Sequence, residues 1–204
     1  MSEKVIKAAL LGLGTVGNGV YKVLKNQREE MEKKIGAVVQ VEKILVRNLK
    51  KAAAKVEDPS ILTNDWKAIL EDPSIEIVIE VMGGFEPART YILEALRAGK
   101  HVVTANKDLV ASNGGELLDC AAEHQCDFLF EAAVAGGIPI IRPLKQCLAG
   151  NHIEEVIGIV NGTTNFILTK MTQEGMEFSE ALALATELGY AEADPTADIR
   201  GYDA

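Results

Sequence analysis

Short apolar runs alternate with segments of helical periodicity along the first 130 residues. Runs that fit buried strands lie at 5–11, 39–46, 75–81, 101–104 and 127–131. Apolar residues recur at helical spacing between these runs, over 16–35, 88–98 and 117–124. Strands that alternate with helices favour a parallel sheet with right-handed crossovers. The pattern therefore predicts an α/β fold, a doubly wound parallel sheet of the Rossmann type.

The character of the chain changes near residue 130. Beyond the break at Gly136-Gly137-Ile138-Pro139, helices are predicted over 139–149, 164–173 and 178–188, and a strand over 153–160. We expect a first domain at 1–130 and the start of a further α/β domain at 131–204. We expect this C-terminal domain to be incomplete, because a helix opening near Asp198 has few residues left before Ala204.

Composition narrows the classes of function. The sequence is 48% hydrophobic and 25% charged, as in globular proteins, and its formal net charge of −9 argues against nucleic acid as the main partner. No apolar run approaches the roughly 20 residues that span a bilayer, so no membrane segment is expected. The start lacks a signal peptide, and Cys120, Cys126 and Cys147 lack metal-site spacing, which indicates a reduced, cytoplasmic protein.

A glycine motif follows the first predicted strand and opens the first predicted helix. Gly12 permits a tight turn, Gly14 lets the backbone approach a pyrophosphate, and Gly17 lets the helix pack on the sheet. The helix N-terminus would favour the anionic phosphates. An ordinary turn without a ligand is the alternative, but the strand-to-helix context favours a dinucleotide.

The end of the second predicted strand bears on which dinucleotide binds. NAD-binding proteins usually place an acid there, whereas this chain has Arg47-Asn48-Leu49-Lys50-Lys51. Arg47 offers a planar fork for a 2′-phosphate, which favours NADP over NAD. A solvated charge run is the alternative.

Further candidates follow the next two strands. Met82-Gly83-Gly84 suggests backbone close to a cofactor, and Thr104-Ala105-Asn106-Lys107 ends at the same edge of the sheet. Lys107 either points into the cleft or is a surface lysine.

Two segments of the C-terminal half suit a small polar substrate. Asn161-Gly162-Thr163-Thr164-Asn165 either holds a carboxylate or simply caps a helix. Four acids lie within 192–203, where they would bind a metal, bind an ammonium group or solvate a loop; spacing alone favours the last.

Taken together, these motifs resemble homoserine dehydrogenase over essentially the whole chain and in the family's order. The segments that carry the resemblance are the glycine loop, 104–107, 131–139, 158–165 and 189–203. The resemblance implies NAD(P)-dependent reduction of aspartate 4-semialdehyde to L-homoserine, in the biosynthesis of threonine and methionine. It also implies a homodimer for the full-length enzyme.

The resemblance also implies roles for particular residues. The cofactor contacts would be Gly12, Gly14, Thr15, Val16, Gly17, Arg47, Gly84, Thr104 and Lys107. The substrate would lie among Thr163, Tyr190, Glu192, Asp198 and Asp203. Lys107, Glu192 and Asp203 would be the catalytic residues, with Lys107 donating a proton to the developing alkoxide. A monovalent cation, typically sodium in the family, would lie at Glu131, Val134, Gly136 and Ile138.

One departure from the family pattern affects the C-terminal end. The family has another lysine one helical turn beyond the aspartate that matches Asp203, and this chain ends one residue after Asp203. We therefore expect a fragment of a longer enzyme. Rival interpretations are another NAD(P)-dependent dehydrogenase of small amino acids or aldehydes, and a non-catalytic dinucleotide-binding module.

Overall fold

The computed structural model describes residues 4–159, 161–191, 196 and 200. The chain divides into two compact units, Met1–Ile141 and Arg142–Ala204. This division falls after the boundary that the sequence suggested at residue 130. The assignment of the segments 1–130 and 131–204 to two functional domains stays a prediction.

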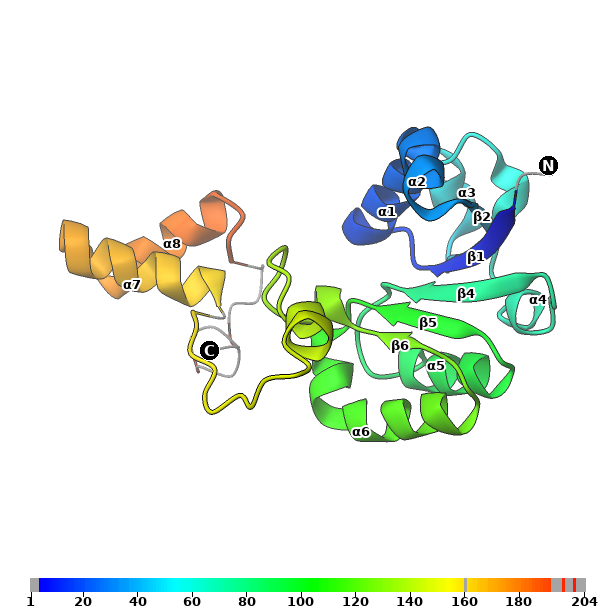
Figure 1. Ribbon diagram of the computed structural model, residues 1–204. Coiled ribbons are helices and arrows are strands. Elements are labelled where there is room, and N and C mark those ends of the chain that lie inside the picture. Colours follow the sequence, from blue (N-terminus) through cyan, green and yellow to red (C-terminus); the bar gives the residue numbers. More distant parts are fainter. Residues whose placement is uncertain (1–3, 160, 192–195, 197–199, 201–204) are drawn as a thin grey trace. The chain divides into compact units, whose positions relative to one another are not determined.

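The first unit is built on a sheet of six parallel strands (Figure 1). They are β1 (Val5–Leu11), β2 (Val38–Leu45), β3 (Leu62–Thr63), β4 (Ile75–Glu80), β5 (His101–Thr104) and β6 (Phe128–Leu129). Their order is β3-β2-β1-β4-β5-β6, and every neighbouring pair is parallel. The order reverses between β1 and β4, which is where doubly wound sheets form a crevice for ligands.

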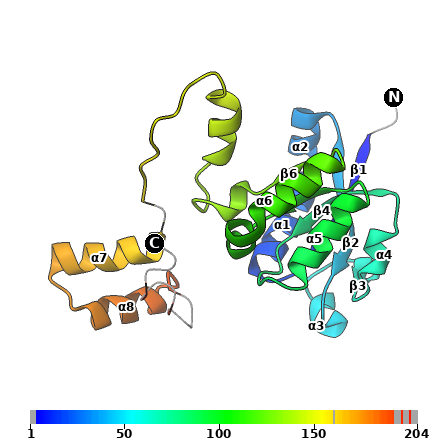
Figure 2. The ribbon, with the colours of Figure 1, turned by 90° about the horizontal axis from the view of Figure 1, so that it is seen from below.

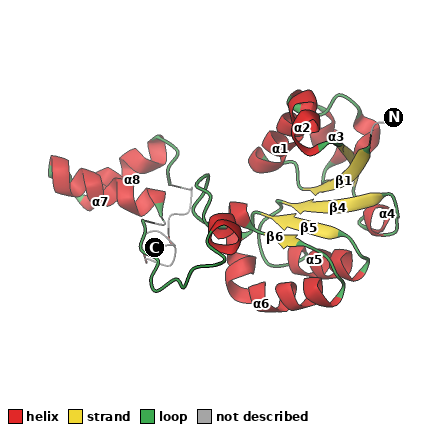
Figure 3. Ribbon diagram, viewed as in Figure 1, coloured by secondary structure: helices red, strands yellow, loops and turns green. Residues whose placement is uncertain are grey.

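Helices cover both faces of this sheet (Figure 3). They are α1 (Thr15–Asn26), α2 (Arg28–Ile35), α3 (Leu49–Ala53), α4 (Lys67–Leu70), α5 (Ala88–Arg97) and α6 (Lys107–Glu123). Short 3-10 turns occur at Pro59–Ile61 and Glu131–Ala133. Figure 1 shows α1 and α2 above the sheet and α5 and α6 below it.

The strand β1 is buried on both faces, as the apolar run predicts. Side chains alternate between the faces of a strand, so Ala9 and Leu11 pack with α5 and α6. Leu10 points to the other face and packs with residues of α1 and α3. This two-sided burial explains why β1 lacks the polar alternation of a half-exposed strand.

In the second unit, α7 (Gly162–Glu174) and α8 (Phe178–Glu187) form a helix pair, seen side by side in Figures 1 and 2. Gly175 ends α7 in the left-handed conformation, at φ 66°, and so reverses the chain. Ile167, Ala181 and Ala185 form the buried centre of the pair. A π-helical turn, Pro143–Cys147, precedes these helices along the chain.

Most of the predicted elements of regular structure are confirmed, and the strand expected at 153–160 was wrong. Residues 153–159 form no strand, and Val160 lies outside the described residues. A strand needs a neighbour to bond its amides, and the described part of the second unit contains no other strand. The helix expected at 117–124 is present, but it begins earlier, at Lys107.

Candidate active site

The glycine loop joins β1 to α1 and closes tightly against the neighbouring strands. Gly12 has φ +100°, and its amide donates to the Leu45 carbonyl at 3.0 Å. A Cβ on Gly17 would lie 2.1 Å from the Gly12 carbonyl oxygen, so only glycine lets α1 start this close to the turn. A Cβ on Gly14 would meet nothing within 4 Å, which leaves space above the loop.

The first turn of α1 is prepared for an anion. Its N-cap is Gly14, which offers no capping side chain, and the first turn holds no acidic residue. Thr15 and Val16 are exposed there, whereas Gly17 is buried against the turn. The unsatisfied amides of a helix N-terminus therefore face the space above the loop.

A cleft of about 560 Å³ lies where the loops after β1, β2 and β4 meet. This volume is in the range of pockets that hold a cofactor. The residues that the sequence predicts for the cofactor and that line it are Gly12, Gly14 and Arg47. The cleft lies at the carboxyl ends of the strands, beside the point where the strand order reverses.

The wall of the cleft that follows β2 is basic. Arg47, Lys51 and Lys55 line it, and Glu86 is the one acid among the described lining residues. The Lys55 ammonium donates to the Leu13 carbonyl of the glycine loop at 2.8 Å. Asn48 caps α3 by accepting the Lys51 amide, which fixes the turn that carries Arg47. No carboxylate stands at the end of β2, as the sequence indicated.

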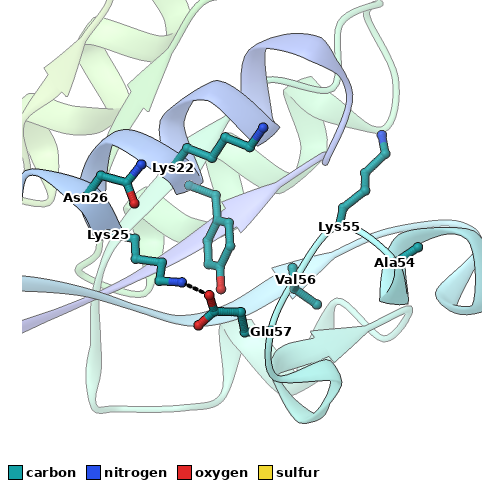
Figure 4. A pocket seen from close by; sticks show the side chains of 8 residues that line it. Lys22, Lys25, Asn26, Ala54, Lys55, Val56 and Glu57 are labelled. Atoms are coloured by element: carbon teal, nitrogen blue, oxygen red, sulfur yellow. Dashed lines mark ion pairs between the residues drawn. The ribbon is translucent and has the colours of Figure 1, made fainter.

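Another hollow, of about 440 Å³, lies between the C-terminal half of α1 and the segment after α3 (Figure 4). Lys25 and Glu57 form an ion pair in it. Figure 4 shows the Lys55 side chain pointing away from that pair. This hollow contains no residue of the glycine loop, so we do not assign the cofactor to it.

The loops after β4 and β5 are joined by a buried polar network. Glu80 is fully buried, and its carboxylate accepts the Thr104 hydroxyl at 2.7 Å. Thr104 itself accepts the Asn106 amide at 3.0 Å. Its hydroxyl thus serves the network, and contact between Thr104 and a cofactor stays a prediction.

Lys107 and Gly84 lie at the same pair of loops. Asn106 donates from its side chain to the Gly84 carbonyl at 2.7 Å and caps α6 by accepting the Leu109 amide. Lys107 is the first residue of α6, and it and Gly84 are exposed. The network therefore places an exposed lysine beside the loop that follows β4.

Residues 131–141 form a compact turn that contains the predicted cation ligands. One carboxylate oxygen of Glu131 accepts the amides of Ile140 at 2.6 Å and Ile141 at 3.0 Å. Ala135 and Gly136 have positive φ values of 56° and 60°. Val134 follows the 3-10 turn, and Ile138 is 70% exposed. The described residues include no group of three or more His, Cys, Asp or Glu side chains suited to a metal.

Two of the predicted substrate residues meet in the second unit. The Thr163 hydroxyl donates to the Tyr190 carbonyl at 2.6 Å, and the Tyr190 ring stacks on Phe166 at 4.8 Å. Asn161 caps α7 by accepting the Thr164 amide at 2.6 Å. The other predicted residues, Glu192, Asp198 and Asp203, lie outside the described residues.

Sequence patterns alone missed several residues of the site. Lys55 and Asn64 line the cleft, and Glu80 accepts the amide of Met82, which also lines it. Lys55 follows the basic run 47–51 by four residues, which was a usable signal. No pattern marked Glu80, because a single acid at the end of an apolar strand has no motif.

Two models of one protein family match successive parts of the chain. Residues 12–131 match the family model described as homoserine dehydrogenase, NAD binding domain. Residues 139–204 match the model described as homoserine dehydrogenase. No described helix is long and apolar enough to cross a membrane.

Curated relatives and solved structures agree with these matches. The chain is 49% identical to a homoserine dehydrogenase of Bacillus subtilis over 98% of its own length and 46% of the relative's. It is 50% identical to that of Corynebacterium glutamicum, over 96% of this chain and 44% of the relative. A crystal structure of a homoserine dehydrogenase from Thiobacillus denitrificans matches with a TM-score of 0.92 and 49% identity, covering 98% of this chain and 46% of that one.

A hyperthermophilic archaeal homoserine dehydrogenase in complex with NADPH matches with a TM-score of 0.82 and 29% identity, covering 98% of this chain and 66% of that one. The chain spans a little under half the length of the curated relatives described above. With both family models matched in order, the chain belongs to the homoserine dehydrogenase family.

Proposed function

We propose that the protein reduces L-aspartate 4-semialdehyde to L-homoserine with NADPH, in the pathway to threonine and methionine. The observation that carries this proposal is the pairing of two family matches on one chain, the nucleotide-binding part and the catalytic part. The cleft at the β1–β4 reversal supports it, because it combines a glycine loop with a basic wall.

For the cofactor we propose a path along the carboxyl edge of the sheet. Gly12, Gly14, Thr15, Val16 and Gly17 would receive the pyrophosphate at the N-terminus of α1. Arg47 would hold the 2′-phosphate, helped by Lys51 on the same wall. Gly84, Thr104 and Lys107 would lie at the nicotinamide end. NADP is thus preferred and NAD remains the weaker ligand.

When bound, the cofactor supplies the hydride that reduces the aldehyde carbon. We propose that the Lys107 ammonium donates the proton that the aldehyde oxygen gains, and recovers one from water afterwards. Thr163, Tyr190, Glu192, Asp198 and Asp203 are the proposed substrate residues. Glu192 would balance the substrate's ammonium group, and Glu192 and Asp203 would assist Lys107 in the catalytic centre.

A monovalent cation, sodium in the first instance, is proposed at the turn 131–141. The proposed ligands are Glu131 and the backbone carbonyls of Val134, Gly136 and Ile138. The donor chemistry fits, since carboxylate and carbonyl oxygens suit a hard cation. The cation would stiffen the turn that ends the first unit, a structural role.

The oligomeric state and the cellular compartment are also proposals. We propose a homodimer for the full-length enzyme, supported by the strongly exposed apolar side chains Val156, Ile157 and Ile159. A cytoplasmic location is proposed because all three cysteines are free, Cys147 being exposed. Light scattering on the full-length enzyme tests the dimer: a monomer mass at micromolar concentration contradicts it.

The proposed activity is tested by NADPH oxidation by the whole protein in the presence of aspartate 4-semialdehyde. We expect oxidation that depends on that aldehyde and forms homoserine. Equal turnover of other small aldehydes would favour a different amino-acid or aldehyde dehydrogenase. NADPH binding without any turnover would favour a non-catalytic module.

A further inference from the structure

Glu80 is an acid with no access to solvent at the carboxyl edge of the sheet. It ends β4, the strand beside the point where the strand order reverses, and none of its surface is exposed. Three donors converge on its carboxylate: the Met82 amide at 2.7 Å, the Gly83 amide at 3.3 Å and the Thr104 hydroxyl at 2.7 Å. Burying an acid is costly, and these three bonds are what offset the cost.

These bonds set the direction of the loop after β4. In a trans peptide, the N–H of one residue points opposite to the carbonyl of the residue before it. Because the Met82 and Gly83 amides point at Glu80, the carbonyls of Val81 and Met82 point away from it. The Val81 carbonyl oxygen accordingly lies 3.0 Å from where a Cβ on Gly12 would stand. The Val81 carbonyl therefore faces Gly12 of the glycine loop, and Val81, Met82 and Gly12 all line the cleft.

The same carboxylate fixes the loop after β5. Strand β5 pairs with β4, and the arrowheads of both strands lie at the same edge of the sheet in Figure 1. Glu80 bonds Thr104, Thr104 accepts the Asn106 amide, and Asn106 both bonds the Gly84 carbonyl and caps α6. Lys107 is the next residue. One buried carboxylate therefore connects both loops to the start of the helix that carries Lys107.

We propose that Glu80 is a positioning residue, which orients the Met82–Gly84 loop toward the cofactor and holds Lys107 beside it through Thr104 and Asn106. The role of Lys107 rests on the proposed function, whereas the effect on cofactor binding rests on the cleft alone. The Val81 and Met82 carbonyls, which point away from Glu80, would accept hydrogen bonds from the hydroxyls or the carboxamide of the dinucleotide, and they disfavour a phosphate at this wall.

A matched control separates positioning from stability. Lys100 is also buried, directly before the start of β5, and its ammonium donates to the carbonyls of Asp72 at 2.6 Å and Ile75 at 2.9 Å. Ile75 begins β4, so Lys100 acts at the amino edge, opposite the cleft. Lys100→Met removes a buried charged group as Glu80→Ala does, and it leaves the carboxyl edge alone.

The test measures NADPH affinity, kcat and KM for Glu80→Ala, Glu80→Gln, Thr104→Val and Lys100→Met, at a temperature where circular dichroism shows each to be folded. Glu80→Ala should weaken NADPH binding about tenfold and lower kcat about 100-fold, the scale of a small misplacement of reacting groups. Glu80→Gln keeps an oxygen for the two amides and should recover to within about tenfold of wild type in kcat. Lys100→Met should lower only the thermal midpoint.

If Glu80→Ala does not fold, Thr104→Val provides the test, because the Thr104→Val substitution removes the hydroxyl that connects the two loops. We then expect a fall in kcat larger than that of Lys100→Met at equal loss of thermal midpoint. Wild-type affinity and kcat in all folded variants, or equal losses in Lys100→Met, would overturn the proposal. If the wild-type protein binds NADPH without reducing the aldehyde, the proposed function fails, and the affinities still decide the role of Glu80.

Discussion

Gly12, Gly14 and Gly17 differ in the reason that each position needs glycine, and this difference is testable at the level of single residues. A Cβ on Gly17 would stand 2.1 Å from the Gly12 carbonyl oxygen, a clash with backbone that no rotamer relieves. We expect Gly17→Ala to push α1 away from the turn and to cost about 1–3 kcal/mol of stability. NADPH affinity should fall with it, as measured by urea unfolding and by cofactor titration.

The neighbouring glycines supply the controls. Gly14→Ala meets nothing within 4 Å, so it should leave stability unchanged and still weaken NADPH binding, because its methyl group would enter the pyrophosphate space. Gly19→Ala, farther along α1 and also unobstructed, should leave binding unchanged and stabilise the helix by about 1 kcal/mol. Full NADPH affinity in Gly14→Ala would show that the pyrophosphate binds elsewhere.

Arg47 is the residue on which the preference for NADPH rests. It lies exposed on the cleft wall, and no acid follows β2 to repel a phosphate. Arg47→Asp should weaken NADPH by about 1.5–3 kcal/mol, the value of a hydrogen bond to a charged group, and leave NADH nearly unaffected. Comparing the two dissociation constants checks this, with Lys22→Ala outside the cleft as the control. An unchanged ratio would remove Arg47 from the 2′-phosphate site.

Residues that belong to a motif could be found from the sequence, and residues defined by tertiary contacts could not. The glycine loop and Arg47 each have a local signal, and the structure places them in one cleft. Glu80 depends on partners 2, 3 and 24 positions away, which only the pairing of β4 with β5 brings together. The sequence places Asn106 next to Lys107, but no sequence pattern predicts the hydrogen bond from the Asn106 side chain to the Gly84 carbonyl.

At the scale of elements, the long apolar runs predicted the central strands well. The short elements α3, β3 and α4 escaped notice because each has five residues or fewer, too few to show a period. The early start of α6 was hidden by Gly114 and Gly115, which weaken a helix pattern. The Asn106 cap and the buried Leu109 outweigh those glycines. Residues 153–159 have the composition of a strand, but the described residues of the second unit offer no other strand to pair with them.

The contact between α5 and α6 predicts a dependence of stability on pH. Arg89 binds Glu116 through two hydrogen bonds, one of them from Nε at 2.9 Å, and this pairing lowers the pKa of the Glu116 carboxyl. A lowered acid pKa gives stability that is present above the unfolded value of about 4.3 and is lost as the pH falls through the folded value.

We therefore expect the thermal midpoint of wild type to exceed that of Glu116→Gln near neutral pH, with a gap that narrows as the pH falls below about 4. The gap should be small, because the pair is at the surface and salt screens it. Glu123→Gln, on the same helix and without such a pair in the described structure, is the control. A gap that stays constant from neutral to acid pH would contradict the assignment.

On the scale of the whole molecule, the two units divide the proposed work. The first unit contains the cleft, the glycine loop and Lys107. The second contains Thr163 and Tyr190, and the Thr163 hydroxyl donates to the Tyr190 carbonyl. Each unit matches its own family model, although the chain spans 46% of the Bacillus subtilis relative. NADPH binding therefore tests the role proposed for the first unit, and aldehyde-dependent turnover tests the whole proposed function.

The proposed function makes the whole protein an NADPH-dependent reductase of aspartate 4-semialdehyde in which Lys107 supplies the proton. The most direct measurement is the initial rate of NADPH oxidation with this aldehyde by the whole protein, for wild type and Lys107→Met, together with NADPH affinity. We predict aldehyde-dependent turnover in wild type and a loss of about 100-fold or more in Lys107→Met, with NADPH affinity retained within a few-fold. Wild-type NADPH binding without turnover, or full turnover in Lys107→Met, would contradict the account.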